Sequence, residues 1–144
     1  TVFKQLFGGG NVDLVLEDKT NVMESGIQIV AEPPGKHLQN ILLLSGGEKA
    51  LTAIALLFAL LKINPSPLCI LDEIDAALDI MNCELLGGLI KNYSKKAQYV
   101  VVSHSEHFVQ SSDIIYGVTM NDTKISNVVS LDLRNVKEYV EEES

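Results

Sequence analysis

The sequence predicts an α/β fold with a mostly parallel sheet, flanked by helices and bounded at one edge by a hairpin. Two short apolar segments, residues 68–71 and 99–102, are typical of parallel strands in a sheet that is covered on both faces. Helical patterns precede the first segment and separate it from the second, so helices alternate with strands. The chain has 144 residues, of which 47% are apolar, and this is the size of one domain with a core of its own.

The N-terminal part of the chain predicts two strands that are each buried on one side. Residues 12–16 and 26–31 alternate apolar and polar side chains, which is the pattern of a half-buried strand. A run of three glycines at 8–10 and a Pro-Pro-Gly cluster at 33–35 separate these strands from their neighbours.

A long helix is predicted over residues 49–62. Its apolar residues fall on overlapping faces, so we expect it to be largely buried. Ser45 suits the N-cap position, and Glu48, three residues later, completes a capping box, so the segment between them opens the helix. The Asn-Pro-Ser-Pro segment at 64–67 ends the helix, because proline cannot continue it.

The second half of the chain adds a helix and a hairpin. The helix is predicted from about residue 81 to residue 93, although glycines at 87 and 88 weaken it. Residues 114–120 and 125–133, joined by an Asn-Asp turn at 121–122, are predicted to form a hairpin at the edge of the sheet.

The start of the long helix is a candidate phosphate-binding site. Free amide N–H groups and the helix macrodipole give this end a partial positive charge. Gly46 and Gly47 allow an anion to approach the backbone closely. A Ser-Gly-Gly-Glu sequence alone is more often an ordinary capped helix after a glycine turn. Because so apolar a helix follows, we interpret the motif as a phosphate site made by Ser45, Gly46, Gly47 and Glu48.

Two adjacent carboxylates, Asp72 and Glu73, follow the apolar strand at 68–71. Ligands of open α/β sheets bind at the carboxyl ends of strands, and side chains alternate along a strand, so the two groups can have different roles. Asp72 is suited to hold Mg²⁺ through water. Glu73 is suited to orient and deprotonate an attacking water. The alternative is a solvated acidic loop, but the segment 74–79 that follows favours the functional interpretation.

His104 follows the second apolar strand, at the same kind of strand exit. An imidazole in this position can hydrogen-bond a phosphate or steady the attacking water. His107 and His37 are interpreted as surface residues. His104 and His107 do not form a metal pair, because no cysteine or carboxylate falls at a supporting spacing.

The sequence contains no G-x-x-x-x-G-K-[ST] loop to hold the phosphates of a nucleotide. Gly35-Lys36 resembles the end of such a loop, but Val30 stands in place of its first glycine and His37 in place of its Ser or Thr. This segment is therefore interpreted as a turn. The chain is predicted to carry half of an ATPase site.

Composition excludes several classes of protein. A formal net charge of −8, to which the acidic segment 141–143 contributes, argues against strong non-specific nucleic-acid binding by this chain alone. No apolar run approaches the length of a membrane span. Cys69 and Cys83 do not suggest a disulfide scaffold, which favours an intracellular protein. The N-terminus has no initiator Met and no secretory pattern, so we expect it to lie within a longer protein.

These motifs together resemble those of the ABC-type ATPases. Residues 44–48 resemble the signature motif, 68–73 the Walker B strand, 77–79 the D-loop and 103–104 the H-loop, in an order and spacing that fit the superfamily. Within it, residues 72–79 resemble the structural-maintenance-of-chromosomes (SMC) proteins, whereas transporters usually place Pro after the Glu.

Three further segments, 7–10, 33–36 and 116–120, are also similar to SMC proteins, and the last favours the prokaryotic, homodimeric branch. Lys49 stands where Arg is common. The resemblance covers residues 1–144 and identifies them as the C-terminal lobe of an SMC head. It implies an N-terminal lobe with a Walker A loop, a coiled coil and a hinge that are absent from this chain.

The resemblance also implies how the residues act on ATP and Mg²⁺. Two heads would sandwich two ATP molecules, each bound by the Walker loops of one head and the signature of the other. Asp72, Glu73 and His104 would act in cis, on nucleotide held by the N-terminal lobe. The residues expected to act in trans or at the interface between heads are Ser45, Gly46 and Gly47, on the γ-phosphate, and Asp79, between the two heads.

The implied function is ATP hydrolysis that drives head engagement for chromosome condensation and segregation. The implied partners are the N-terminal lobe, a second and identical head, a kleisin subunit and DNA in the full complex. Such a protein would be cytoplasmic and associated with the nucleoid, or nuclear in a eukaryote.

Three other assignments remain open at this point. A related DNA-repair ATPase with coiled coils would share the phosphate motifs but would lose the resemblance at 8–10 and 116–120. The nucleotide-binding domain of an ABC transporter would need Pro near position 74 and contacts with a membrane domain. A non-enzymatic assignment is an assembly module that dimerises or binds a kleisin without hydrolysing ATP alone.

Overall fold

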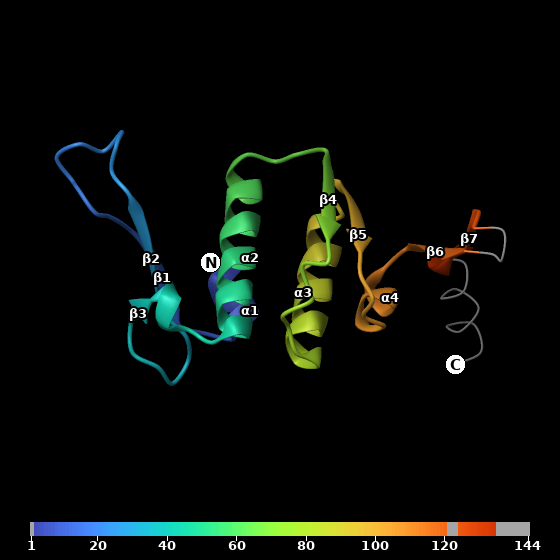
Figure 1. Ribbon diagram of the computed structural model, residues 1–144, viewed down its shortest axis with the longest axis horizontal. Coiled ribbons are helices and arrows are strands. Elements are labelled where there is room, and N and C mark those ends of the chain that lie inside the picture. The colour runs from blue at the N-terminus through green and yellow to red at the C-terminus, as the bar shows by residue number, and fades with distance from the viewer. Residues whose placement is uncertain (1, 121–123, 135–144) are drawn as a thin grey trace.

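The computed structural model describes residues 2–120 and 124–134, and its elements are spread along the longest axis, with the first helix beside the second (Figure 1). The helices are α1 (Val2–Phe7), α2 (Gly46–Ile63), α3 (Ile80–Tyr93) and α4 (His107–Ser111), with a 3-10 turn, η1, at Ile41–Leu43. The strands are β1 (Asn11–Leu16), β2 (Ile27–Glu32), β3 (Gln39–Asn40), β4 (Leu68–Asp72), β5 (Gln98–Val102), β6 (Ile114–Met120) and β7 (Ser126–Asp132).

The predicted α/β class is confirmed, and the two apolar strands are parallel neighbours. β4 pairs with β5 so that Ile70 lies opposite Val100. The helix α3 between them supplies the crossover that parallel strands need. The other described strands pair antiparallel, as β1-β2-β3 and as the hairpin β6-β7. The described strands form three separate sheets, and parallel pairing is confined to β4 and β5, because no helix lies between the strands that pair in the other two sheets.

Both predicted N-terminal strands and the predicted hairpin are present, but the hairpin forms a two-stranded sheet of its own rather than the edge of a larger sheet. β1 and β2 pair along their whole lengths, from Asn11 opposite Glu32 to Leu16 opposite Ile27. β6 and β7 do the same, from Ile114 opposite Asp132. The predicted turn at 121–122 and the acidic segment 141–143 lie outside the described residues.

The core lies where α1, α2 and α3 meet. Each helix contributes a fully buried side chain: Phe3, Phe58 and Leu86. The Phe58 ring also stacks on Tyr99 of β5, with ring centroids 6.1 Å apart, and meets Tyr93 edge-on at 5.1 Å. This packing ties the helix that carries the predicted phosphate motif to the strand that leads to the predicted imidazole.

α2 was expected to be largely buried and the parallel strands to be covered on both faces, but each leaves one side exposed in the part of the chain that the structure describes. Ile63 is 81% exposed, and Ile70 is 67% exposed. Side chains at alternate positions of a strand share a face, and this chain covers only one face of the β4–β5 pair. The exposed apolar side chains are Leu57, Leu60 and Ile63 of α2, and Leu68, Ile70, Val100 and Val102 of β4 and β5.

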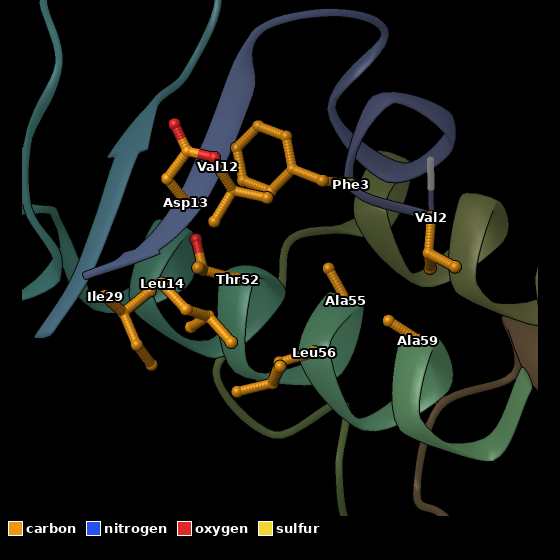
Figure 2. A pocket seen from close by; sticks show the side chains of 10 residues that line it. All are labelled: Val2, Phe3, Val12, Asp13, Leu14, Ile29, Thr52, Ala55, Leu56 and Ala59. Atoms are coloured by element: carbon orange, nitrogen blue, oxygen red, sulfur yellow. The ribbon is translucent and has the colours of Figure 1, made fainter. Parts of the chain in front are cut away.

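A hollow of about 200 Å³ lies between α1, α2 and the β1-β2 hairpin (Figure 2). Asp13 and Thr52 are its only polar lining side chains, and the Thr52 hydroxyl donates to the Glu48 carbonyl at 2.7 Å. Such an apolar lining does not suit a phosphate. The other lining residues are Val2, Phe3, Val12, Leu14, Ile29, Ala55, Leu56 and Ala59.

Among the described helices, none combines the length and the apolar character needed to cross a membrane.

Candidate functional site

The predicted capping box at the start of α2 is present. The Glu48 N–H donates to the Ser45 Oγ at 3.4 Å, and the Ser45 N–H donates to the Glu48 carboxylate at 3.0 Å. The Ser45 hydroxyl also donates to that carboxylate, at 2.7 Å. At Gly46, no atom outside its chain neighbours and its own helix backbone lies within 4 Å of the position that a Cβ would take. The first turn is therefore exposed at Gly46, while its Glu48 N–H is already capped by Ser45.

The phosphate motif lies beside the segment that resembles a D-loop. A Cβ on Gly47 would be 3.3 Å from the carbonyl oxygen of Ala77. In Figure 1, α2 and α3 both begin at the lower side of the molecule. Asp79 is the N-cap of α3, where it accepts from the Asn82 N–H at 2.9 Å. Asp79 thus has a capping role that the sequence analysis did not assign, in addition to its predicted place between heads.

Lys36 makes an ion pair with Glu48, with its Nζ 2.8 Å from Oε1 and 2.9 Å from Oε2. The turn predicted at Gly35-Lys36 is confirmed by the Lys36 N–H, which donates to the Pro33 carbonyl at 3.0 Å. Hydrogen bonds from Lys36 and then from the Ser45 hydroxyl and N–H lower the pKa of Glu48 from 4.5 to about 2. The sequence analysis missed this ion pair, which holds the loop against the phosphate motif.

Replacing Glu48 with Gln is expected to remove a pH-dependent part of the stability. Because the pKa of Glu48 is lower in the folded chain, its contribution is full above pH 4.5 and is lost as the pH falls towards 2. Lys36 is 46% exposed, so solvent screens the pair and we expect about 1 to 2 kcal/mol rather than the full value. Denaturant unfolding of the chain and of Glu48→Gln across this range measures the difference.

The Asp132 carboxyl serves as an internal reference for that experiment. A hydrogen bond from Arg134 lowers its pKa to about 2 as well, and it titrates in both proteins. The difference between them therefore isolates Glu48. A difference in unfolding free energy that stays constant from pH 6 to pH 2 would contradict the assignment.

The predicted acid and imidazole meet at the ends of the two parallel strands. The His104 Nε2 lies 3.2 Å from the Glu73 Oε1. The Glu73 N–H donates to the Val102 carbonyl at 2.9 Å, which extends the pairing of β4 and β5 by one bond. Both side chains are well exposed, Glu73 at 55% and His104 at 88%. A water held between this pair and a ligand would face a carboxylate that can accept its proton.

Glu73 adopts a left-handed backbone conformation, with φ of +48°. Residues with a Cβ rarely adopt this conformation, which costs about 1–3 kcal/mol and clusters at functional sites. It turns the chain sharply at the end of β4, so that Asp72 and Glu73 do not simply continue the alternation of the strand. The strain is consistent with a specialised position for the Glu73 carboxylate.

Asp72 is the predicted metal ligand at this strand end. Asp72 is exposed at the end of β4. Within residues 2–120 and 124–134, no group of three or more His, Cys, Asp or Glu could enclose a metal. Mg²⁺ is usually held by one or two carboxylates together with waters and substrate phosphates. His107 pairs instead with Glu84, with Nδ1 3.6 Å from Oε1.

The candidate site therefore consists of two separate parts. One is the open start of α2, with Ser45, Gly46, Gly47 and Glu48. The other is the strand end with Asp72, Glu73 and His104. Among the described residues, no hydrogen bond or ion pair joins the two parts. The sequence analysis also missed Asp75, a buried carboxylate, although its position two residues after Glu73 was a signal that could have identified it.

Comparisons with known proteins agree on one family. Residues 10–127 match the family described as the RecF/RecN/SMC N terminal domain. The chain is 49% identical over 140 residues to the chromosome partition protein Smc of Bacillus subtilis, and the match covers 97% of this chain. That match covers only 12% of the Bacillus protein, so the chain spans about an eighth of the length of this relative.

Solved structures of SMC heads have the same fold. An Smc head domain from Pyrococcus furiosus, with an extended coiled coil and bound to the C-terminal domain of ScpA, is 41% identical with a TM-score of 0.87. The match covers 98% of this chain and 35% of that one. A structure from work on ATP-driven dimerization and DNA stimulated activation of SMC ATPases is 40% identical, with a TM-score of 0.84, over 98% of this chain and 85% of that one.

Proposed function

The chain belongs to the RecF/RecN/SMC N terminal domain family, and from this we propose that it is the C-terminal lobe of the ATPase head of a chromosome-partition SMC protein. The observation that carries the proposal is the contact between Glu73 and His104 at the ends of adjacent parallel strands. A carboxylate and an imidazole at this edge suit the activation of a water for phosphate hydrolysis. The function is ATP-driven engagement of heads for chromosome condensation and segregation.

We propose that the N-terminal lobe covers the exposed face of the β4–β5 pair. Asp72 follows Leu68 and Ile70 at alternate positions of β4, so its side chain shares their exposed face. A lobe that packed on this apolar face would bring its phosphate-binding loop to the strand end where Asp72 stands. The buried apolar area would at the same time stabilise the two lobes as one head.

We propose the following roles for the residues of the site in ATP hydrolysis. Asp72 would hold Mg²⁺, through water, against nucleotide bound by the N-terminal lobe. When bound, Mg²⁺ would neutralise charge on the phosphates. Glu73 orients and deprotonates the attacking water, and His104 steadies that water or hydrogen-bonds the γ-phosphate. The start of α2, with Ser45, Gly46 and Gly47, faces the γ-phosphate bound to a second, identical head, and Asp79 lies between the heads.

The proposed partners follow from the same assignment. The Pyrococcus furiosus Smc head was solved bound to the C-terminal domain of ScpA. We propose that a kleisin subunit of this kind binds the head to which this chain belongs. DNA is proposed as the ligand of the whole complex, since the charge of −8 does not favour this chain as the DNA-binding part. We propose a cytoplasmic, nucleoid-associated protein on the basis of its bacterial relatives.

The alternatives have less support. The family description covers repair ATPases as well as SMC proteins, but the relatives and solved structures named above are SMC proteins. Residue 74 is Ile, where a transporter would usually have Pro. The assembly-module assignment and the ATPase assignment are compatible, because an isolated lobe lacks the phosphate-binding loop.

The experiment that tests the proposal is reconstitution of the head. The purified chain is expected to bind ATP poorly and not to hydrolyse it, because the sequence has no G-x-x-x-x-G-K-[ST] loop. Addition of the N-terminal lobe is expected to restore Mg²⁺-dependent phosphate release. The matched control is Glu73→Gln with the same N-terminal lobe, which reports contaminating ATPases. Robust, Mg²⁺-dependent turnover by the wild-type chain alone, absent from the Gln variant, would contradict the half-site assignment.

A further inference from the structure

A buried hydrogen bond joins the two turns that carry the predicted acid and imidazole. Asp75 lies two residues beyond Glu73 and is only 8% exposed. Its Oδ2 accepts from the Ser103 hydroxyl at 2.7 Å, and Ser103 directly precedes His104. A buried carboxylate without a donor would be costly, so this contact is strongly favoured in the folded chain.

Ser103 also fixes the turn on which His104 stands. Its oxygen accepts from the Ser105 N–H at 2.9 Å. The Ser103 hydroxyl therefore donates to Asp75 and accepts from the residue that follows His104. His104 therefore lies between Ser103 and Ser105, which are joined to each other through the Ser103 Oγ. With its side chain 88% exposed, His104 has little packing of its own to hold it, and the backbone turn determines its position.

Backbone hydrogen bonds close the opposite turn, in which Asp75 stands. The Leu78 N–H donates to the Asp75 carbonyl at 2.9 Å, and the Ala76 N–H donates to the Glu73 carbonyl at 3.1 Å. These bonds close the turn that holds Glu73 in its left-handed conformation. Besides the bond from the Glu73 N–H to Val102 and the Glu73–His104 contact itself, the Asp75–Ser103 hydrogen bond connects the two strand ends.

We infer that Asp75 and Ser103 are positioning residues for ATP hydrolysis, which hold Glu73 and His104 at the separation needed to orient the attacking water. This inference rests on the proposed ATPase function of the head. Asp75 and Ser103 act through the two exposed side chains and do not touch nucleotide themselves. A shift of about 1 Å at a reacting group can lower a rate by about a hundredfold. Loss of the buried Asp75–Ser103 hydrogen bond is therefore expected to lower the rate of ATP hydrolysis.

The test is performed on the reconstituted, two-lobed head. Ser103→Ala is expected to lower kcat about tenfold or more, while ATP affinity and ATP-dependent head pairing change less than about twofold. Ser103→Thr keeps the hydroxyl and is expected to restore most of kcat. Asp75→Asn keeps an oxygen that can accept from Ser103 and is expected to lose less than Asp75→Ala. The matched control is Ser94→Ala, which removes a hydroxyl bonded to the Lys91 carbonyl at the end of α3 and is expected to leave kcat unchanged.

A second background separates positioning from a general role in folding. In a head that already carries His104→Ala, Ser103→Ala is expected to cause little further loss of kcat, because residues that act as a unit are not additive. A further tenfold loss there, or a parallel loss of ATP affinity and head pairing, would overturn the inference. If Ser103→Ala does not fold, Asp75→Ala, which removes the acceptor of the same hydrogen bond, and its conservative control Asp75→Asn provide the same comparison.

The proposed function and the positioning role of Asp75 and Ser103 can be tested separately. A wild-type head that binds but does not hydrolyse ATP would overturn the proposed function, and the inference with it. An active wild-type head whose Ser103→Ala variant has an unchanged kcat would overturn the inference alone.

Discussion

Replacing Glu73 with Gln is expected to lower ATP hydrolysis by the reconstituted head by about 10²- to 10⁴-fold while ATP still binds. Gln has nearly the shape of Glu and can still hydrogen-bond the His104 ring, which lies 3.2 Å away. It cannot accept the proton of the attacking water. Because hydrolysis no longer releases the heads, two heads should stay together on ATP, and the mass of the complex measures this directly.

Asp72→Asn is the matched comparison, since it removes the neighbouring carboxylate with the same change in shape. Its expected effect is weaker binding of magnesium-nucleotide, because Asn is a poorer ligand for Mg²⁺ than a carboxylate. Isothermal titration with and without Mg²⁺ distinguishes the two variants. Equal losses of nucleotide affinity in Glu73→Gln and Asp72→Asn would show that the separate roles assigned to these residues are wrong.

Replacing Ser45 with Arg is expected to abolish ATP-dependent head pairing, and with it hydrolysis. Residue 45 caps the exposed first turn of α2, next to Gly46, so a large side chain there would obstruct a ligand that approaches this turn. ATP binding by a single head should remain nearly intact, since the triphosphate is held by the N-terminal lobe. Nucleotide affinity and the mass of the dimer, measured in one sample, give both quantities.

Ser45→Ala is the control for the role of Ser45 in its own helix. Loss of the N-cap is expected to cost about 1 kcal/mol of stability. If Ser45→Arg lost nucleotide affinity and pairing together, Ser45 would belong to the pocket of its own head or to its folding, contrary to the trans assignment.

Local spacing was enough to predict the elements that depend on neighbours in sequence. Ser45 and Glu48 are three residues apart, so the capping box and the start of α2 could be predicted without tertiary information. The parallel strands could be predicted from composition, because the helix between them leaves few other ways to pair. α1 and α4, with six and five residues, are too short to show a helical period and were missed.

Contacts between distant segments could not be predicted in the same way. Lys36 and Glu48 are twelve residues apart, and Asp75 and Ser103 are 28 apart. Their partners depend on how the turns after β2, β4 and β5 meet in space. The overestimated burial at Ile63 and Ile70 has another cause. An apolar pattern indicates that a face will be covered but not whether the covering segment belongs to the same lobe.

The pairing of Glu73 and His104 lies between these two cases. Their positions after two apolar strands placed them at one edge of the sheet, because adjacent parallel strands end on the same side. The distance of 3.2 Å depends on the left-handed turn at Glu73 and on the bond between Asp75 and Ser103. Neither of these could be read from spacing.

The central claim is that one site combines Glu73 of one head with Ser45 of another, and mixing two inactive variants tests it most directly. Glu73→Gln heads and Ser45→Arg heads are each expected to be inactive. In a mixed pair, one of the two sites carries both substitutions and the other carries neither. An equal mixture should therefore regain turnover, and a quarter of the wild-type value, about what random pairing would give, is the upper limit. The value is expected to fall below that limit, because Glu73→Gln heads stay together on ATP and a mixed pair is held by one complete site only. A mixture in which mixed pairs are detected by mass, but which stays as inactive as its separate components, would contradict the trans arrangement.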